Sequence, residues 1–451
     1  MDPIKTAVLV IAVSMYALVI LFQNKKVLIT SAAAALLIIL GMIMPGKIFI
    51  LPQDVVAQDG IFPSIIFAFT HSLFSLIDWN VLMIYLGSMI VASMFIYSKV
   101  PLKLADVLIS RSRNSAVAVV FVLILTGLLS TFIENIVAVV IMAPVAFSIC
   151  SKTRLNPLAF ICALAMISNI EGTATLVGDP PSIIFASYAG YNFNDFFFHN
   201  GKLSVFFIVQ AGMIAGCIFY FMTFARKSRD KIFGESEKVI SWVPLILLAV
   251  MILGLSFVPF IPYRFDYASG LCVMAAACMS ILWFKFFQKK TVSDTAKKLK
   301  ELDWESICFL MGIFIVTGAV SECGLLDILA GFLSKVCGQS ALKGFLIILV
   351  FSVLLSGFIN NVPFIIAMLP VANSMAFSMR INPELYMFAL LIGCCLGGNL
   401  SPYGASANVA AMGIIKKEGN EISFKKWMRI GVPFTVITTV ASSVLLWVLW
   451  S

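Results

Sequence analysis

Long apolar blocks separated by short polar segments run along almost the whole chain. Of the 451 residues, 61% are hydrophobic and 12% charged, with a mean hydropathy of +1.04. So few polar groups could not cover the surface of a soluble protein of this length. Seven blocks approach or exceed the length of a helix that crosses ~30 Å of hydrocarbon: Thr6–Phe22, Val27–Met44, Val81–Tyr97, Leu203–Phe224, Trp242–Val258, Tyr267–Phe284 and Val432–Trp450. We therefore predict an all-α polytopic membrane protein of the cell (inner) membrane.

The first apolar block could be mistaken for a cleaved signal peptide. Only Lys5 lies ahead of it, and its basic pair, Lys25 and Lys26, follows the apolar run. A cleaved signal carries its positive charge in front, so we expect this block to remain as a transmembrane helix.

The two halves of the chain are similar in sequence. One constant spacing, the distance in sequence from Ser130 to Ser356, relates several pairs of residues. It relates Asn135 to Asn361, Pro144 to Pro370, Asn156-Pro157 to Asn382-Pro383, Gly172 to Gly398 and Gly178 to Gly404. A spacing shorter by a single position relates Asp78-Trp79 to Asp303-Trp304. Chance apolar similarity would not keep polar residues and prolines in register, so we predict an internal duplication.

The basic residues indicate how the two copies are oriented. The net charge is +9, and the excess is explained by cytoplasmic loops rather than by nucleic-acid binding. If all basic clusters are cytoplasmic, the chain has ten spans, five per copy, and the second copy is inverted. We read Ile61–Ile77 as an outer interfacial helix; as an eleventh span it would reverse the N-terminus. The predicted units are a first repeat 1–225, a cytoplasmic linker 226–240 and a second repeat 241–451.

Each repeat is predicted to contain a re-entrant helical hairpin. In 116–150 the polar sequence Ser130-Thr-Phe-Ile-Glu-Asn interrupts the apolar run, and in 345–377 Ser356-Gly-Phe-Ile-Asn-Asn does so. Arms of about 13 residues span ~20 Å, too little to cross the bilayer. Such turns survive only beside water or inside protein.

A broken helix is predicted after each hairpin, over 156–189 and 383–415. Gly172, Gly178 and the pair Pro180-Pro181 interrupt the first. Ordinary proline kinks are the alternative interpretation, but four breaks in matched positions favour two interrupted helices that meet at the midplane, a typical transporter arrangement.

Three carboxylates, on Glu134, Glu171 and Asp179, lie in or beside the first-repeat breaks, where no Lys or Arg is present. An acid in the membrane is expensive, so these groups should bind a proton or a cation. The predicted cation site comprises Ser130, Glu134, Asn135, Gly172, Thr173, Thr175 and Asp179. The predicted site for substrate or a second cation comprises Ser356, Asn360, Asn361, Gly398, Asn399 and Ser401. The ten cysteines lack any metal-binding spacing, so we expect no metal beyond Na⁺, and no cofactor.

The sequence Asn169-Ile-Glu-Gly-Thr-Ala-Thr-Leu-Val-Gly-Asp-Pro-Pro-Ser resembles the N-I-G-G-x-A-T-x-x-G-D-P-P-N signature of the ion transporter superfamily. The resemblance extends from Asp78 onward and is closest to the branch of NhaD-type antiporters, arsenite permeases and the P protein, with a citrate-transporter-like (CitMHS/DASS-related) domain. It implies a scaffold, a mobile transport domain, a homodimer and an elevator mechanism. Glu134 replaces the usual Asp, Asn360 a common Asp, Ser182 an Asn and Glu171 a Gly, so the substrate is left open.

These features predict an ion-coupled secondary transporter that uses Na⁺ or H⁺ to move a small inorganic or carboxylate anion. A Na⁺/H⁺ antiporter is the alternative, favoured by the acid-rich site. An arsenite efflux permease, a channel or a receptor is a weaker hypothesis. We expect no enzyme, because no nucleophile–base pair is present.

Overall fold

The computed structural model describes residues 2–53, 61–153, 155–225, 238–261, 266–338 and 340–451. Its helices are α1 (Pro3–Leu21), η1 (Gln23–Lys25), α2 (Lys26–Ile43), α4 (Ile61–Phe74), α5 (Trp79–Tyr97), α6 (Val100–Arg111), α7 (Ser115–Ser130), α8 (Asn135–Lys152), α9 (Pro157–Glu171), α10 (Pro180–Ala189), η2 (Phe193–Phe196), α11 (Val205–Ala225), α12 (Val243–Phe257), η3 (Val258–Phe260), α13 (Ala268–Leu282), η4 (Trp283–Phe287), α14 (Val292–Lys300), α15 (Trp304–Glu322), α16 (Leu325–Cys337), α17 (Ala341–Ser356), α18 (Asn361–Ser378), α19 (Pro383–Gly397), η5 (Gly398–Leu400), α20 (Ser406–Lys417) and α21 (Phe424–Trp450). Strands β1 (Phe198–His199) and β2 (Lys202–Leu203) form a short antiparallel hairpin.

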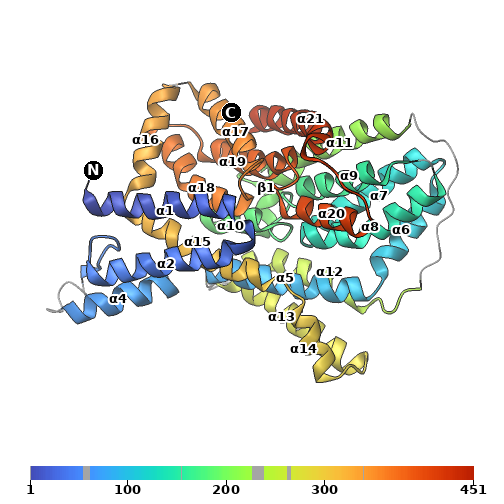
Figure 1. The fold of residues 1–451 in the computed structure, drawn as a ribbon, viewed down its shortest axis with the longest axis horizontal. Coiled ribbons are helices and arrows are strands. Elements are labelled where there is room, and N and C mark those ends of the chain that lie inside the picture. The colour runs from blue at the N-terminus through green and yellow to red at the C-terminus, as the bar shows by residue number, and fades with distance from the viewer. Residues whose placement is uncertain (1, 54–60, 154, 226–237, 262–265, 339) are drawn as a thin grey trace.

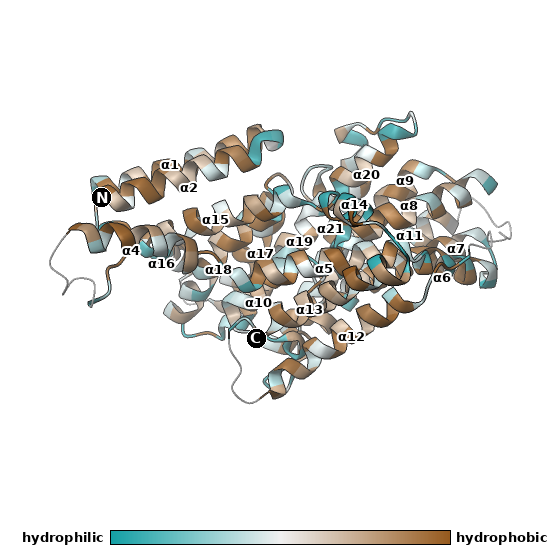
Figure 2. Cartoon of the chain, turned by 90° about the horizontal axis from the view of Figure 1, so that it is seen from below, coloured by the Kyte–Doolittle hydropathy of each residue, from teal (hydrophilic) through white to brown (hydrophobic). Residues whose placement is uncertain are grey.

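The described part of the chain is a multi-pass membrane protein. Eleven stretches are long and apolar enough to cross a bilayer, with α4 and α5 forming one continuous stretch. Apolar residues colour most helices along their full length (Figure 2). The outward faces of α1, α2, α12 and α21 carry exposed large apolar side chains, which water would not favour but lipid does. The prediction of an all-α membrane fold is confirmed.

Seven successive α-helices of the first half match seven of the second in order, and four of the pairs are equal in length. α5 and α15 both have 19 residues, α7 and α17 both have 16, α8 and α18 both have 18, and α9 and α19 both have 15. Helix α6 corresponds to α16, α10 to α20 and α11 to α21. Figure 1 shows α7, α8 and α9 toward one end of the molecule and α16, α17 and α18 toward the other. This agreement supports the duplication; the opposite orientation of the copies and the unit boundaries stay predictions.

The hairpin arms are longer than the sequence pattern indicated. We expected arms of about 13 residues, but α7 has 16 residues and α8 has 18. The cause is local, because the Asn114 side chain caps α7 at Val117 N and helix geometry continues through Ser130. Only Thr131–Glu134 form the tip. The two arms pack against each other and against α9.

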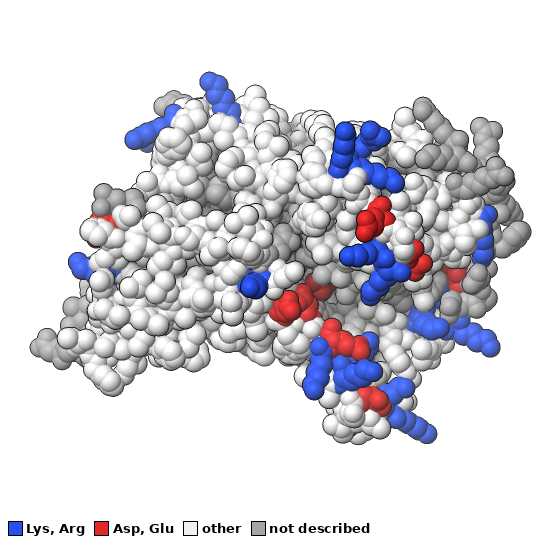
Figure 3. Space-filling model, in the orientation of Figure 1, with Lys and Arg blue, Asp and Glu red and all other residues white. Residues whose placement is uncertain are grey.

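Lys and Arg gather on one part of the surface in the view of Figure 3, including the end of α14, whereas the part over α1, α2 and α4 is largely uncharged. Helix α14 carries Lys297, Lys298 and Lys300, and α20 ends with Lys416 and Lys417. The uneven distribution is what the positive-inside rule predicts. Most of the predicted linker 226–240 lies outside the described residues.

The inverted orientation can be tested at two exposed positions related by the repeat spacing, Ser110 on α6 and Val336 on α16. In a background without reactive native cysteines, we expect Ser110→Cys to react with a membrane-impermeant maleimide only from the cytoplasmic side. Val336→Cys should react only from outside, because inversion places matched residues on opposite faces. Labelling of both from one side would show that the copies are parallel.

Candidate functional site

The tip of the first hairpin is held to the following helix by one serine. The Ser130 hydroxyl lies 2.5 Å from Asn135 Oδ1 and 2.9 Å from the carbonyl oxygen of Ser168 on α9. Both Ser130 and Asn135 are buried. These contacts join the end of α7 to the start of α8 and to the last turn of α9.

The second tip repeats this arrangement at the matched positions. The Ser356 hydroxyl lies 2.5 Å from Asn361 Oδ1 and 2.5 Å from the carbonyl oxygen of Cys394 on α19. The same bonds, at positions related by the repeat spacing, build the same tip from two different sequences. Ser130 and Ser356 therefore fix the tips and do not themselves line the cavity between them.

Glycines at matched positions of the two breaks allow equally close approaches. A Cβ on Gly178 would lie 2.5 Å from the carbonyl oxygen of Gly172 and 2.9 Å from that of Ser130. A Cβ on Gly404 would lie 2.5 Å from the Gly398 carbonyl oxygen, with the same close contact to the Ser356 carbonyl. No side chain fits at either position, so each break is pressed against its own tip.

The two tips and two breaks meet around a small cavity of about 20 Å³, enough for a particle the size of one water. The described residues that line it are Glu134, Asn135, Ile136, Asn169, Asp179, Pro180, Pro181, Asn360, Asn361, Val362, Ala405, Ser406 and Ala407. None of them is basic. The structure thus brings together Glu134, Asn135 and Asp179 from the predicted cation site with Asn360 and Asn361 from the predicted second site.

Glu134 is 9% exposed, and its Oε1 accepts a hydrogen bond of 3.0 Å from the Tyr85 hydroxyl on α5. Asp179 follows the first break and also borders the cavity. Among the described residues no basic side chain forms an ion pair with either carboxylate. Sequence reasoning missed Tyr85, because a single tyrosine in an apolar helix gives no signal of the partner it meets.

The remaining predicted residues of the first site stabilise the backbone and do not line the cavity. The Gly172 carbonyl accepts from the Ser182 hydroxyl at 3.3 Å, and a Cβ on Gly172 would collide with the Asn135 amide. The Thr173 hydroxyl donates to the Asn169 carbonyl oxygen at 3.1 Å, and the Thr175 hydroxyl donates to a tip carbonyl, that of Thr131.

In the second half, Gly398, Asn399 and Ser401 likewise support the break. The carbonyl oxygens of Gly398 and Ser401 each accept a 2.9 Å hydrogen bond from the Asn408 side chain. Asn399 Oδ1 accepts a 2.8 Å bond from Asn169. Asn169 and Asn408 were not among the predicted site residues. Asn408 could have been found, because the repeat spacing matches it to Ser182.

The two helices that begin at the cavity have opposite chemistry at matched positions. α10 starts with Pro180-Pro181, which have no backbone N–H, after the carboxylate of Asp179. α20 starts with Ser406-Ala407 after Ala405, and no side chain caps it. The first-half helix end therefore offers oxygen to a cation, whereas the second-half end offers N–H groups and the positive end of the helix dipole to an anion.

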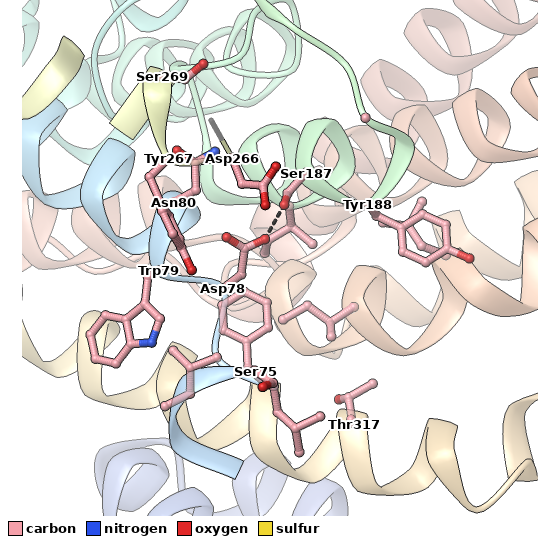
Figure 4. A pocket seen from close by; sticks show the side chains of 18 of the residues that line it. Ser75, Asp78, Trp79, Asn80, Ser187, Tyr188, Asp266, Tyr267, Ser269 and Thr317 are labelled. Carbon is pink, nitrogen blue, oxygen red and sulfur yellow. Dashed lines mark hydrogen bonds between the residues drawn. The ribbon is translucent and has the colours of Figure 1, made fainter. Parts of the chain in front are cut away.

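The described part of the chain has two larger cavities besides the central one. One of about 370 Å³ shares Ile136, Asn360, Ala405 and Ser406 with the central cavity and also includes Lys26. The other, of about 760 Å³, shares no lining residue with the central cavity in the described part of the chain. Figure 4 shows it, with Asp78 hydrogen-bonded to Ser187 of α10 and with Asp266 and Tyr188 nearby. The central site thus adjoins the smaller of these two cavities.

Glu171 lies apart from the other two acids. Its Oε2 accepts from the Thr131 hydroxyl at 3.1 Å and from Gln210 Nε2 at 2.9 Å, and its Oε1 is buried without a hydrogen-bond partner in the described structure. The side chain fits because residue 127 is glycine. A Cβ added to Gly127 would lie 2.8 Å from Glu171 Cγ. In the second half the sizes are exchanged, because Gly397 matches Glu171 and Val353 matches Gly127. Gly397 packs on Val353, and a Cβ added to Gly397 would lie 2.6 Å from Val353 Cα.

The exchange of small and large residues between these matched pairs predicts how substitutions change stability. Gly127→Val should lower the melting temperature of the purified protein, because overpacking a buried contact costs about 1–3 kcal/mol. The double variant with Glu171→Gly, which recreates the second-half pair, should recover most of the loss. An unchanged melting temperature in the single variant would contradict the packing described here.

Comparisons with known proteins agree on one family. The chain matches the family model described as citrate transporter (CitMHS) over residues 16–393 and 269–451. It is 30% identical over 375 residues to the uncharacterized transporter Rv2685 of Mycobacterium tuberculosis, covering 82% of this chain and 86% of that protein. It is 24% identical to the human P protein over 408 residues, 73% of this chain and 48% of that protein.

Solved structures share the fold at low identity. The YdaH transporter of Alcanivorax borkumensis aligns with a TM-score of 0.59 and 15% identity, over 94% of this chain and 98% of that one. MtrF of Neisseria gonorrhoeae, described as one of a class of antimetabolite efflux pumps, aligns with a TM-score of 0.57 and 15% identity, over 93% and 94%. At this identity the likeness concerns the fold alone.

Proposed function

The chain belongs to the citrate transporter family, and from this premise we propose that it is a secondary active transporter that couples Na⁺ or H⁺ to the movement of a small carboxylate or inorganic anion. The transporter class follows from the family and its relatives. The coupling ion, the substrate class and an elevator-type movement within a homodimer are our proposal.

The observation that carries the proposal is the unequal chemistry of two matched helix starts at one cavity. Asp179 and Glu134 supply carboxylate oxygens on the first-half side. Ser406 and Ala407 supply backbone N–H groups on the second-half side, where Ala405 replaces the acid. A cation on one side would neutralise the carboxylates, which otherwise would repel an anion next to them.

The two larger cavities support alternating access. The cavity of about 370 Å³ adjoins the site, and its lining includes Asn24, Lys26 and Asp303, from segments predicted to be cytoplasmic. The cavity of about 760 Å³ shares no described lining residue with the site, and Asp78 at the start of α5 is bonded within it to Ser187 on α10. We take this as an inward-open state, in which the anion leaves toward the cytoplasm past Lys26.

A Na⁺/H⁺ antiporter is the second candidate, because two carboxylates share a cavity that has no basic residue among its described lining residues. Proteoliposomes with an internal pH dye separate the two functions. An antiporter moves protons when Na⁺ alone is added. A transporter that couples Na⁺ or H⁺ to an anion moves no protons when Na⁺ alone is added.

The cation half is tested by Glu134→Gln and Asp179→Asn, which keep size and remove charge. Each should lower cation-dependent citrate uptake into proteoliposomes by at least about tenfold, a loss of ~1.4 kcal/mol. Glu418→Gln, an exposed acid beyond α20, serves as the matched control and should transport like the wild type. Full uptake by both site variants would rule out these carboxylates.

The anion half is tested by Ala405→Asp, which gives α20 the acid that precedes α10. The added charge should weaken citrate binding by at least about tenfold, because it occupies the helix N-terminus. Ala405→Asn, equal in size and uncharged, separates charge from crowding and should bind more tightly than Ala405→Asp. Equal binding by wild type and Ala405→Asp, measured by calorimetry, would place the anion elsewhere.

A further inference from the structure

A chain of side-chain amides joins the two halves next to the central cavity. Asn135 Nδ2 donates to Asn169 Oδ1 at 3.3 Å. Asn169 Nδ2 in turn donates to Asn408 Oδ1 at 3.0 Å and to Asn399 Oδ1 at 2.8 Å. All four side chains are buried, and each has hydrogen-bond partners.

The series of amides ends on α20, the helix whose start we propose binds the anion. Asn408 lies in the first turn of α20, and its two N–H groups donate to the carbonyl oxygens of Gly398 and Ser401, at 2.9 Å each. These bonds fix α20 against the preceding break. Helix α20 also packs on α8 and α9 of the first half, so its start is positioned by both halves.

Each amide in this series donates to the next one, in the direction from Asn135 to Asn408. An amide has one acceptor oxygen and two N–H donors, so the bonds made by Asn408 determine the orientation of its oxygen and hence which atoms of Asn169 face it. Hydrogen bonds in such a series polarise one another. The order runs from Asn135, which borders the carboxylates, to Asn408, which holds the start of α20.

We propose that Asn169 is a positioning residue that couples cation binding at Glu134 and Asp179 to the anion-binding start of α20; this rests on the proposed function. A cation bound between the carboxylates also attracts Asn135 Oδ1. This polarises the amide, so that Asn135 Nδ2 becomes a stronger hydrogen-bond donor to Asn169. The strengthened series then holds Asn408, and through it the N–H groups of Ser406 and Ala407, in the geometry that receives the anion.

The coupling passes through Asn169 on α9, and the matched position in the second half does not repeat it. The position matched to Asn169 is Cys395, a buried residue whose thiol cannot donate two bonds as an amide does. This series of amides, called the relay below, is therefore not duplicated in the second half. Asn169 borders the cavity but supplies neither a carboxylate nor a helix start, so its removal should separate the two binding events while Glu134, Asp179 and the start of α20 remain.

Hydrogen–deuterium exchange of α20 in the purified full-length protein tests the relay without needing the anion. In the wild type, NaCl against choline chloride should slow exchange in the first turn of α20 at least about fivefold, the low end of usual coupling factors. Asn169→Leu should lose this effect, although NaCl still raises its melting temperature. Citrate affinity in NaCl should then be no higher than in choline chloride.

Two further variants control the test. Asn408→Ser breaks the relay at its other end with the residue found at the matched position, Ser182, and should also lose the Na⁺ effect on α20. Asn194→Leu removes an amide that donates to the Ser256 carbonyl oxygen at 2.9 Å, away from the site, and should behave like the wild type.

The outcomes separate the relay from the proposed function. If both relay variants keep the full Na⁺ effect on α20, the relay is wrong and the cation and anion sites stand. If NaCl changes neither melting temperature nor exchange in the wild type, the Na⁺ site is wrong, and the relay falls with it.

Discussion

Interrupting a helix inside a fold that is surrounded by lipid is the constraint on which this structure depends. Each interruption frees backbone N–H and carbonyl groups that no water in the hydrocarbon can satisfy. Small polar side chains donate to carbonyl oxygens around each interruption: Ser130 and Ser356 at the tips, Thr173, Ser182 and Asn408 at the breaks. Matched glycines, Gly178 and Gly404, let break and tip approach to backbone contact.

Once the breaks are stable, the ends of short helices become binding groups. The duplication supplies the same frame twice, so a difference at one matched position changes the chemistry of one side alone. Asp179 against Ala405 is such a difference, and the prolines after Asp179 extend it by removing N–H groups from α10. The ion-coupled transport that we propose needs two unlike ligands in one place, and a divergent pair of equal frames would provide both sites.

The same reasoning explains why the fold persists while sequence changes. YdaH and MtrF share 15% identity with this chain yet align over more than nine-tenths of it. Lipid-facing positions require only apolar residues, and buried helix contacts require small ones, so many sequences satisfy both. The exchange of Glu171 and Gly127 for Gly397 and Val353 shows how two halves of one chain keep a contact while changing its chemistry.

The sequence by itself determined the membrane class, the duplicated segments and the positions of the breaks. Apolar length, the constant register between the halves and the glycines and prolines are local or periodic signals, and they indicate Glu134, Asn135 and Asp179 as site residues. The length of the hairpin arms was underestimated, because capping by Asn114 depends on local geometry more than on hydropathy.

Only the tertiary structure decided which side chains meet. Tyr85 reaches Glu134 from a helix 49 residues earlier, and Asn169 meets Asn408 across 239 residues. It also decided that Thr175 and Ser401 support the backbone while Ala405 and Ser406 line the cavity. The physical reason is that a hydrogen bond depends on a few tenths of an ångström and on direction, and sequence periodicity carries neither across distant helices.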